Sequence, residues 1–230
     1  MQESPPSPRK GRWDALNQCL EANKDSKERQ NGAISTPYSS VNPNDVEGVF
    51  GPIMQSYIQD IKAIPHEDFD LLVRMLAIAR TTLGGGRSGK EAKRLYFIAH
   101  ILTVVCNLFK GDVRIKVEEG LVGKNVKANG YFEFMLVRGN KRVCIVEAKK
   151  EDMEKGQAQC LVGCEVASDL DDLRVVYGIA TTFELWTFLK SSDDKIERDE
   201  TVLLVREGVV DSESLKEIAG KIYAMLSDEN

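Results

Sequence analysis

The feature that most constrains this sequence is an alternating apolar pattern over residues 131–149 that carries charged side chains near its ends. The pattern is typical of a β-hairpin, with Glu133 on the first arm and Glu147 and Lys149 on the second. Because side chains alternate faces along a strand, Glu147 and Lys149 share one face. Placing carboxylates and a lysine at the rim of an apolar sheet costs free energy. A divalent cation with an activated water is the best reason for that placement, so the hairpin predicts a site that binds or cuts a phosphodiester backbone.

Whether Glu133 joins this site depends on the turn between the two arms. A two-residue turn at 139–140 would set Glu133 opposite Val146 and leave Glu147 on the wrong side. A three-residue loop at 139–141 would set Glu133 opposite Glu147 instead. A β-bulge would restore the useful geometry in either case. The sequence leaves these alternatives open.

The apolar periodicity around the hairpin predicts a mixed α/β fold. The central order is α-β-β-β-α-β, preceded by two helices and followed by a β-β-α unit. The first helix is expected to start at Val46 and to carry Ile53, Tyr57, Ile61 and Ile64 on one face. Expected helices cover 46–64, 65–83, 88–109, 152–167 and 212–226, and expected strands cover 113–117, the two arms of 130–149, 173–180, 185–189 and 201–205.

The first 45 residues differ in composition from the rest of the chain. They mix Ser, Pro, Asn and Lys with few apolar positions, and all seven prolines lie at or before Pro65. This composition predicts a disordered or loosely attached polar tail. A single domain is then expected over 46–230, with a helical extension (46–86), a core (87–190) and a C-terminal strand and helix (191–230).

Composition also excludes several classes of protein. No apolar run approaches the roughly 18 residues of a membrane span, and the N-terminus has no hydrophobic segment typical of a secretory signal. The five cysteines show no CxxC spacing, and the two histidines are too few for a multi-histidine metal site. We therefore expect reduced thiols, an intracellular setting and no membrane partner.

The net charge of −5 conceals an uneven distribution along the chain. Residues 87–160 hold 15 Lys/Arg against 9 Asp/Glu, whereas the remaining 156 residues hold 16 against 27. The basic excess therefore coincides with the hairpin, which favours a polyanionic partner there.

Two further stretches complete a pattern with a known counterpart. Glu133, then VEAKK at 146–150 and GQAQ at 156–159, resembles the PD-(D/E)XK nuclease superfamily. The same stretches, with VYGIATTFELWTFLK at 176–190, are similar to the nuclease-like C-terminal domains of Crinkler-type effectors from oomycetes and fungi. The resemblance covers about residues 88–190 and implies a restriction-endonuclease-like fold, with a central mixed sheet flanked by helices.

The resemblance also implies roles for individual residues. Glu133 stands where the superfamily places an aspartate, Glu147 and Lys149 match its E-x-K pair, and Gln159 matches its helix glutamine. Glu91 would be the acid on the first core helix, although Ser88 and Glu91 also form a capping box that explains Glu91 without catalysis. The implied ligands of one or two Mg²⁺ (or Mn²⁺) ions are Glu133, Glu147 and the main-chain carbonyl of Ala148, and the implied nucleic-acid contacts are Arg87, Lys90, Arg94 and Lys150.

The implied partner is double-stranded DNA, with a host protein and a second copy of the chain as further partners and the nucleus as the location. Two other interpretations stay open. A nuclease fold without turnover would bind nucleic acid or a host protein. The run GGGRSGK at 84–90 has the skeleton of a phosphate-binding loop, but Glu91 replaces its metal-binding hydroxyl and a helix precedes it where a strand is needed.

Overall fold

A mixed sheet of eight strands forms the centre of the computed structural model, which describes residues 8–22, 34–84 and 91–228. The strands lie in the order β1-β4-β5-β6-β7-β8-β2, and β3 pairs with β4. Strands β5 and β6 are parallel and are joined by helix α6, while β4 and β5, β6 and β7, and β7 and β8 pair antiparallel. The strands are β1 (Thr36–Pro37), β2 (Met54–Ser56), β3 (Val113–Val122), β4 (Ala128–Arg138), β5 (Lys141–Ala148), β6 (Val176–Thr181), β7 (Leu185–Ser191) and β8 (Ile196–Val202), with a separate pair β9 (Val205–Arg206) and β10 (Val209–Val210).

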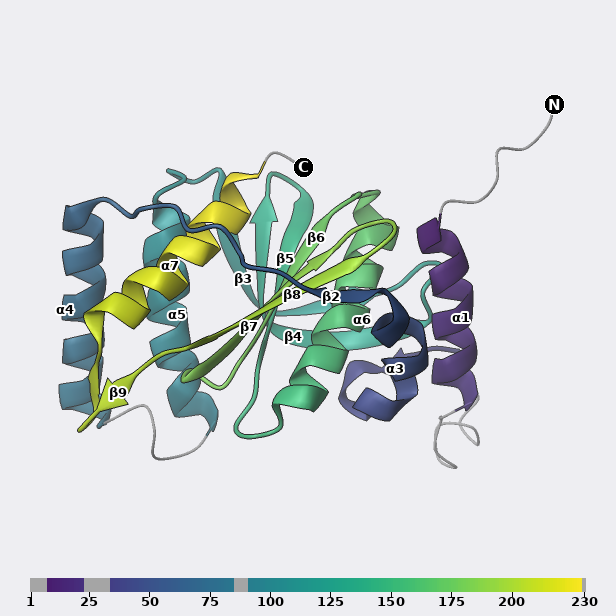
Figure 1. Ribbon diagram of the computed structural model, residues 1–230, viewed down its shortest axis with the longest axis horizontal. Helices are drawn as coiled ribbons and strands as arrows, with labels where there is room; N and C mark the ends of the chain where they lie inside the picture. The colour runs from purple at the N-terminus through teal and green to yellow at the C-terminus, as the bar shows by residue number, and fades with distance from the viewer. Residues whose placement is uncertain (1–7, 23–33, 85–90, 229–230) are drawn as a thin grey trace.

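Helices cover both faces of the sheet (Figure 1). Helices α4, α5 and α7 pack on one face, and α1, α3 and α6 pack on the other. Each face buries its own apolar cluster, the first containing Leu102 and Ile222 and the second containing Ile145 and Val162. The helices are α1 (Pro8–Ala22), α3 (Pro43–Phe50), α4 (His66–Leu83), α5 (Glu91–Asn107), α6 (Met153–Asp171) and α7 (Ser212–Ser227), with short 3₁₀ turns at Tyr38–Ser40 and Gly51–Ile53.

This architecture confirms the predicted mixed α/β class with a central mixed sheet flanked by helices. The helices expected over 65–83, 88–109, 152–167 and 212–226 correspond to α4, α5, α6 and α7. The last expected strand, 201–205, is wrong in its bounds, because β8 starts at Ile196 and ends at Val202.

The prediction of one long helix from Val46 to Ile64 is wrong. Helix α3 ends at Phe50, and Gly51 and Pro52 start a 3₁₀ turn that leads into β2. Proline lacks the N–H that a continuing helix needs and clashes with the preceding turn, so the apolar spacing beyond it does not produce a helix.

The prediction of a loose tail is also wrong for the described part of residues 1–45. Helix α1 buries Trp13, Leu16 and Leu20 in the cluster on its face of the sheet. These residues are three and four positions apart, which is the spacing of one helix face. Two charged side chains of α1, Arg9 and Arg12, are buried as well. Arg9 Nε and Arg12 Nη2 lie 3.2 and 2.9 Å from carboxylate oxygens of Glu165 on α6. A few apolar residues and a buried ion network therefore attach α1 to α6 and the sheet, although the composition of this segment is typical of a disordered tail.

Candidate active site

The β4–β5 hairpin combines a short turn with a bulge. Residues Arg138 and Lys141 pair across a two-residue turn, in which Gly139 has a φ of +56° that glycine adopts readily. The register then shifts between Leu136 and Val137, so that Phe134 pairs with Val146. Continuing that register by one residue sets Glu133 beside Glu147. The bulge therefore provides the geometry that the three-residue loop would have given.

Hydrogen bonding confirms that Glu133 turns toward the end of β5. Its Oε2 atom accepts a hydrogen bond of 3.2 Å from the main-chain N–H of Ala148. In a strand the N–H and C=O of one residue point to the same side, so the Ala148 carbonyl also points toward β4. Glu133, Glu147 and Ala148 thus place oxygen atoms around one point at the rim of the sheet.

The side chain of Lys149 completes this cluster. Its Nζ contacts a side-chain oxygen of Glu147, a residue that is only 5% exposed. The stem of Lys149 passes Gly156 on α6, where a Cβ atom would lie 2.9 Å from Lys149 Cγ. The glycine in the sequence GQAQ therefore makes room for the lysine of the E-x-K pair.

The electrostatics of the cluster are not balanced. Burial, and after it the nearby carboxylate of Glu133, raise the pKa of Glu147 to about 8 against the opposing effect of Lys149. Glu147 therefore retains a proton at neutral pH in the absence of another cation. A site with two carboxylates and one lysine lacks positive charge, which a divalent cation would supply.

Two surface hollows meet at Lys149. One, of about 660 Å³, is lined by Glu133, Lys149 and Leu95 together with Glu118 and Tyr131. The other, of about 400 Å³, is lined by Lys149, Lys150, Asp152, Lys155 and the buried Gln159, together with Ser39 and Glu151. Glu133, Glu147, Lys149 and Gln159, which the sequence nominated, therefore do gather at one place.

The predicted nucleic-acid contacts are only partly described. Arg94 Nη1 donates a hydrogen bond to the main-chain oxygen of Lys150, which joins α5 to the segment after β5. The side chain of Lys150 is exposed, and its Nζ lies 3.4 Å from Glu151. Arg87, Lys90 and the glycine-rich run from Gly85 lie outside the described residues, as does the side chain of Glu91 at the start of α5.

Two residues at the site were not foreseen from the sequence. Glu118 of β3 lies beside Glu133 in the larger hollow and has a φ of +49°, which is uncommon for a residue with a side chain. Tyr131 is exposed beside them. Neither residue stands in a motif, and only the pairing of β3 with β4 brings Glu118 near the site.

The donor set suits a hard divalent cation. Carboxylate and main-chain carbonyl oxygens are the ligands that Mg²⁺ and Mn²⁺ accept, and the protonated Glu147 shows a place where a cation could replace a proton. Within the described residues, no group of three or more His, Cys, Asp or Glu side chains is placed to hold a metal ion. Glu133 and Glu147 would therefore hold it with the Ala148 carbonyl, without a third acidic side chain from the described part of the chain.

Comparisons with known proteins agree with the predicted resemblance to Crinkler-type effectors. The sequence is 43% identical over 219 residues to Crinkler effector protein 5 of Phytophthora infestans, a match that covers 95% of this chain and 62% of that protein. It is 30% identical over 118 residues to Crinkler effector protein 1 of Rhizophagus irregularis, which covers 47% of this chain and 25% of that protein. The chain is homologous to Crinkler effector proteins.

The chain spans less than two thirds of the length of these Crinkler proteins. No protein-family model matches its sequence. Among the helices that the structure describes, none has the length and apolar character needed to cross a membrane.

Proposed function

We propose that this protein is a metal-dependent nuclease of the PD-(D/E)XK type that hydrolyses phosphodiester bonds of double-stranded DNA as a pathogen effector in the host nucleus. The observation that carries this proposal is the convergence of Glu133, Glu147 and Lys149 at the hairpin end, with Glu147 buried and its pKa raised to about 8. The homology to Crinkler effector proteins supports the effector role.

Each residue of the cluster has a chemical part in this proposal. Glu133, Glu147 and the Ala148 carbonyl would hold Mg²⁺ or Mn²⁺, and Glu147 would give up its proton to do so. The bound cation would polarise the phosphate and lower the pKa of water. Lys149 orients the attacking water through its ammonium group and stabilises negative charge that develops on the phosphate.

Residues at the rim would position the substrate. Gln159 lies under the hollow next to Lys149, where its amide can bond to the backbone of the nucleic acid or hold Lys149 in place. Arg94 and Lys150 would contact phosphates, and such contacts weaken as salt rises.

A supercoiled plasmid incubated with Mg²⁺ or Mn²⁺ tests the activity. Wild type is expected to nick or linearise the plasmid, and Glu147→Gln and Lys149→Ala each to lose on the order of 10²- to 10³-fold in rate, as when one group that stabilises the transition state is removed. The matched control is Glu213→Gln, because Glu213 is exposed and forms its ion pair with Lys216 on α7, outside the carboxylate cluster. Equal background in all four folded proteins would refute the nuclease.

A second candidate is a nuclease fold that binds DNA or a host protein without turnover. It is favoured by one observation, that only two acidic side chains are placed to hold a metal in the described chain. Fluorescence anisotropy with a labelled DNA duplex separates the two candidates. DNA binding by wild type and Glu147→Gln, without cleavage by either, would support the binding module.

A further inference from the structure

The outer edge of the sheet is covered along only part of β8. Strand β2 pairs with β8 at Ile196–Arg198, and the main-chain N–H of Tyr57 then bonds to the Arg198 oxygen. Beyond this point the two segments separate. The main-chain N–H of Lys62 bonds to the Gly220 oxygen on α7, so the chain has crossed from the sheet to the helix. A wedge therefore opens between β8 and the segment 60–65.

Within the described residues, the backbone of β8 presents hydrogen-bonding groups to this wedge that no strand pairs with. The N–H of Leu203 bonds to the Glu184 oxygen on the β7 side, whereas the Arg198 oxygen bonds on the β2 side. Because successive residues of a strand direct these groups to opposite edges, those of Glu200 and Val202 point outward. In the part of the chain that the structure describes, no strand pairs with this side of Glu200 and Val202.

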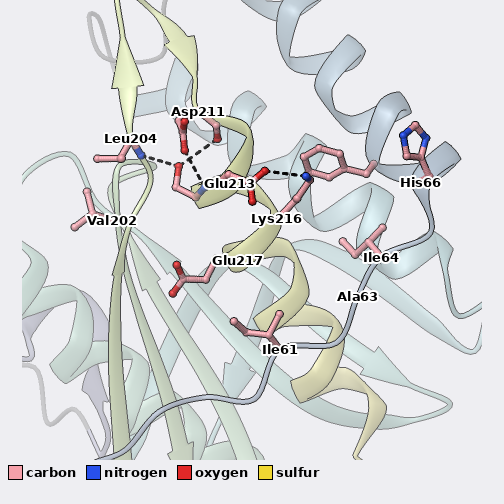
Figure 2. Close-up of a pocket in the computed structure, with 12 residues that line it drawn as sticks. Ile61, Ala63, Ile64, His66, Val202, Leu204, Asp211, Glu213, Lys216 and Glu217 are labelled. Carbon is pink, nitrogen blue, oxygen red and sulfur yellow. Dashed lines mark hydrogen bonds and ion pairs between the residues drawn. The ribbon is translucent and has the colours of Figure 1, made fainter.

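The wedge is apolar and large enough for a peptide. Its cavity volume is about 830 Å³. Figure 2 shows Val202 and Leu204 on one side of α7 and Ile61 and Ile64 on the other. Ile61, Val202 and Leu204 are 57%, 51% and 44% exposed. Grouped apolar side chains exposed to this extent commonly mark an interaction site.

The charge of the wedge argues for a polypeptide and against a nucleic acid. Its lining carries Asp211, Glu213 and Glu217, and Glu200 is a neighbouring exposed acid on the strand edge. Lys216 pairs with Glu213 and Lys221 pairs with Glu217, so that the acids still outnumber the bases. This acidic rim would repel phosphates and attract Lys or Arg side chains. The surface is thus opposite in sign to the basic segment around the candidate active site.

The other edge strand shows how this sheet protects an edge that is not used. Strand β3 pairs only with β4 among the described strands, and its exposed side chains include Arg114, Lys116 and Glu118. Its backbone is interrupted at Glu118, where φ is +49°. Charged side chains and backbone irregularities are the usual protection against strand addition. The outward edge of β8 also carries an exposed charge at Glu200, but no residue of β8 has a positive φ, and Ile61, Val202 and Leu204 border the edge.

We propose that this wedge binds an extended segment of a partner protein, which adds as a strand to the outer edge of β8. The partner segment would bond to the main chain of Glu200 and Val202 and place alternate apolar side chains against Ile61, Val202 and Leu204. Lys or Arg residues at its ends would meet the carboxylates of α7. Strand addition of this kind obtains affinity from main-chain hydrogen bonds and specificity from alternate side chains.

A labelled peptide of alternating valine and threonine with lysine at both ends is the probe. Fluorescence anisotropy is expected to show saturable binding to wild type and a loss of roughly tenfold or more for Val202→Lys and for Ile61→Lys, as for side chains at the centre of an interface. The matched control is Val117→Lys, which alters an exposed valine on the β3 edge and should bind as wild type does. A peptide methylated on the main-chain nitrogens that would face β8 should not bind.

Amide hydrogen exchange supplies the readout that locates the peptide. Saturating peptide is expected to slow exchange at Glu200 and Val202, as is usual for N–H groups that join a sheet ladder. Unchanged exchange at both residues, or equal peptide binding by wild type, Val202→Lys and Ile61→Lys, would overturn the proposal. Protection of the same amides without peptide, in a dimer seen by sedimentation, would assign the edge to a second copy and would also overturn it.

Discussion

Two buried glutamates illustrate how this molecule treats charge in its core and at its candidate site. Glu165 on α6 accepts hydrogen bonds from Arg9, Arg12, Trp13 Nε1 (2.7 Å) and Ser191 Oγ (2.6 Å). Burial alone would raise its pKa, but the two arginines and Ser191 bring the pKa below its ordinary value. Glu147 has one lysine and a second carboxylate, and its pKa rises to about 8. The first glutamate is fully compensated by its own chain, and the second is left short of positive charge.

This difference separates a structural role from a functional one. A buried ion that is completely hydrogen-bonded contributes to the specificity of packing, here by attaching α1 to α6. A buried carboxylate with an incompletely compensated charge is a cost to the fold that a ligand can remove. Replacing each glutamate by glutamine tests whether the two positions differ in this way.

The largest effect on stability is expected for Glu165→Gln. The substitution removes the shared counter-charge of Arg9 and Arg12 and leaves, among the described residues, only Asp193, 3.6 Å from Arg9 Nη1; removing one partner of a buried pair costs about 3–5 kcal/mol. Glu147→Gln is expected to lose no stability at pH 7 and to gain some, because only the wild type gives up stability when Glu147 ionises in the unfolded chain. Urea unfolding of both variants at pH 7 measures the difference, and equal losses would contradict the distinction.

The pH dependence of stability should have opposite signs at the two positions. Glu165 has a lowered folded pKa, so its contribution is present above pH 4.5 and is lost as pH falls below it. Glu147 keeps its proton when folded but ionises above about pH 4.5 when unfolded, so stability falls as pH rises from about 4.5 to 8.

Glu147→Gln removes that fall. In metal-free buffer, the variant should therefore gain on wild type by at most about 1.4 kcal/mol for each pH unit over this window. Urea unfolding between pH 5 and 9 provides the measurement. A stability difference between wild type and Glu147→Gln that does not change with pH would show that the proton is not held at Glu147.

A pair of glycines on α6 sharpens the comparison without changing charge. An added Cβ at Gly163 would lie 2.4 Å from Phe132 Cζ in the core, so Gly163→Ala should cost about 1–3 kcal/mol through overpacking.

At Gly156 the added Cβ would meet Lys149 Cγ instead. Gly156→Ala should therefore lower plasmid cleavage by displacing Lys149 while changing stability less than Gly163→Ala does, since alanine also favours the helix by up to about 1 kcal/mol. Thermal unfolding and cleavage rates measured on both variants test the pair. Loss of activity in proportion to loss of stability in both would contradict a special position for Gly156.

The sequence predicted the site better than it predicted the attachment of the N-terminal helix. Alternation in the hairpin and the E-x-K spacing are local properties, so the sequence predicted that Glu147 and Lys149 share a face, whereas the position of Glu133 depended on the turn. The bulge that aligns them could only be named as one way to obtain the register, because a shift of one residue leaves little trace in a sequence.

Non-local contacts account for what the sequence did not predict. Arg9 and Arg12 look like tail residues until Glu165, more than 150 positions later, provides their partner. Glu118 comes near Glu133 only through the pairing of β3 with β4. Beyond Phe50, the apolar spacing suggested a helix, but Gly51 and Pro52 redirect the chain into β2 at the sheet edge.

The direct test of the cation site is Mn²⁺ binding at pH 7, measured by titration calorimetry in two buffers with different heats of protonation. Wild type should bind Mn²⁺ and release most of one proton, because a carboxyl with a pKa of about 8 is mostly protonated at that pH. Glu147→Gln should bind far more weakly and release none, whereas the exposed variant Glu213→Gln on α7 should match wild type. Binding to wild type without proton release, or the same binding by Glu147→Gln, would contradict the assignment of Glu147 as the carboxylate that exchanges its proton for the metal.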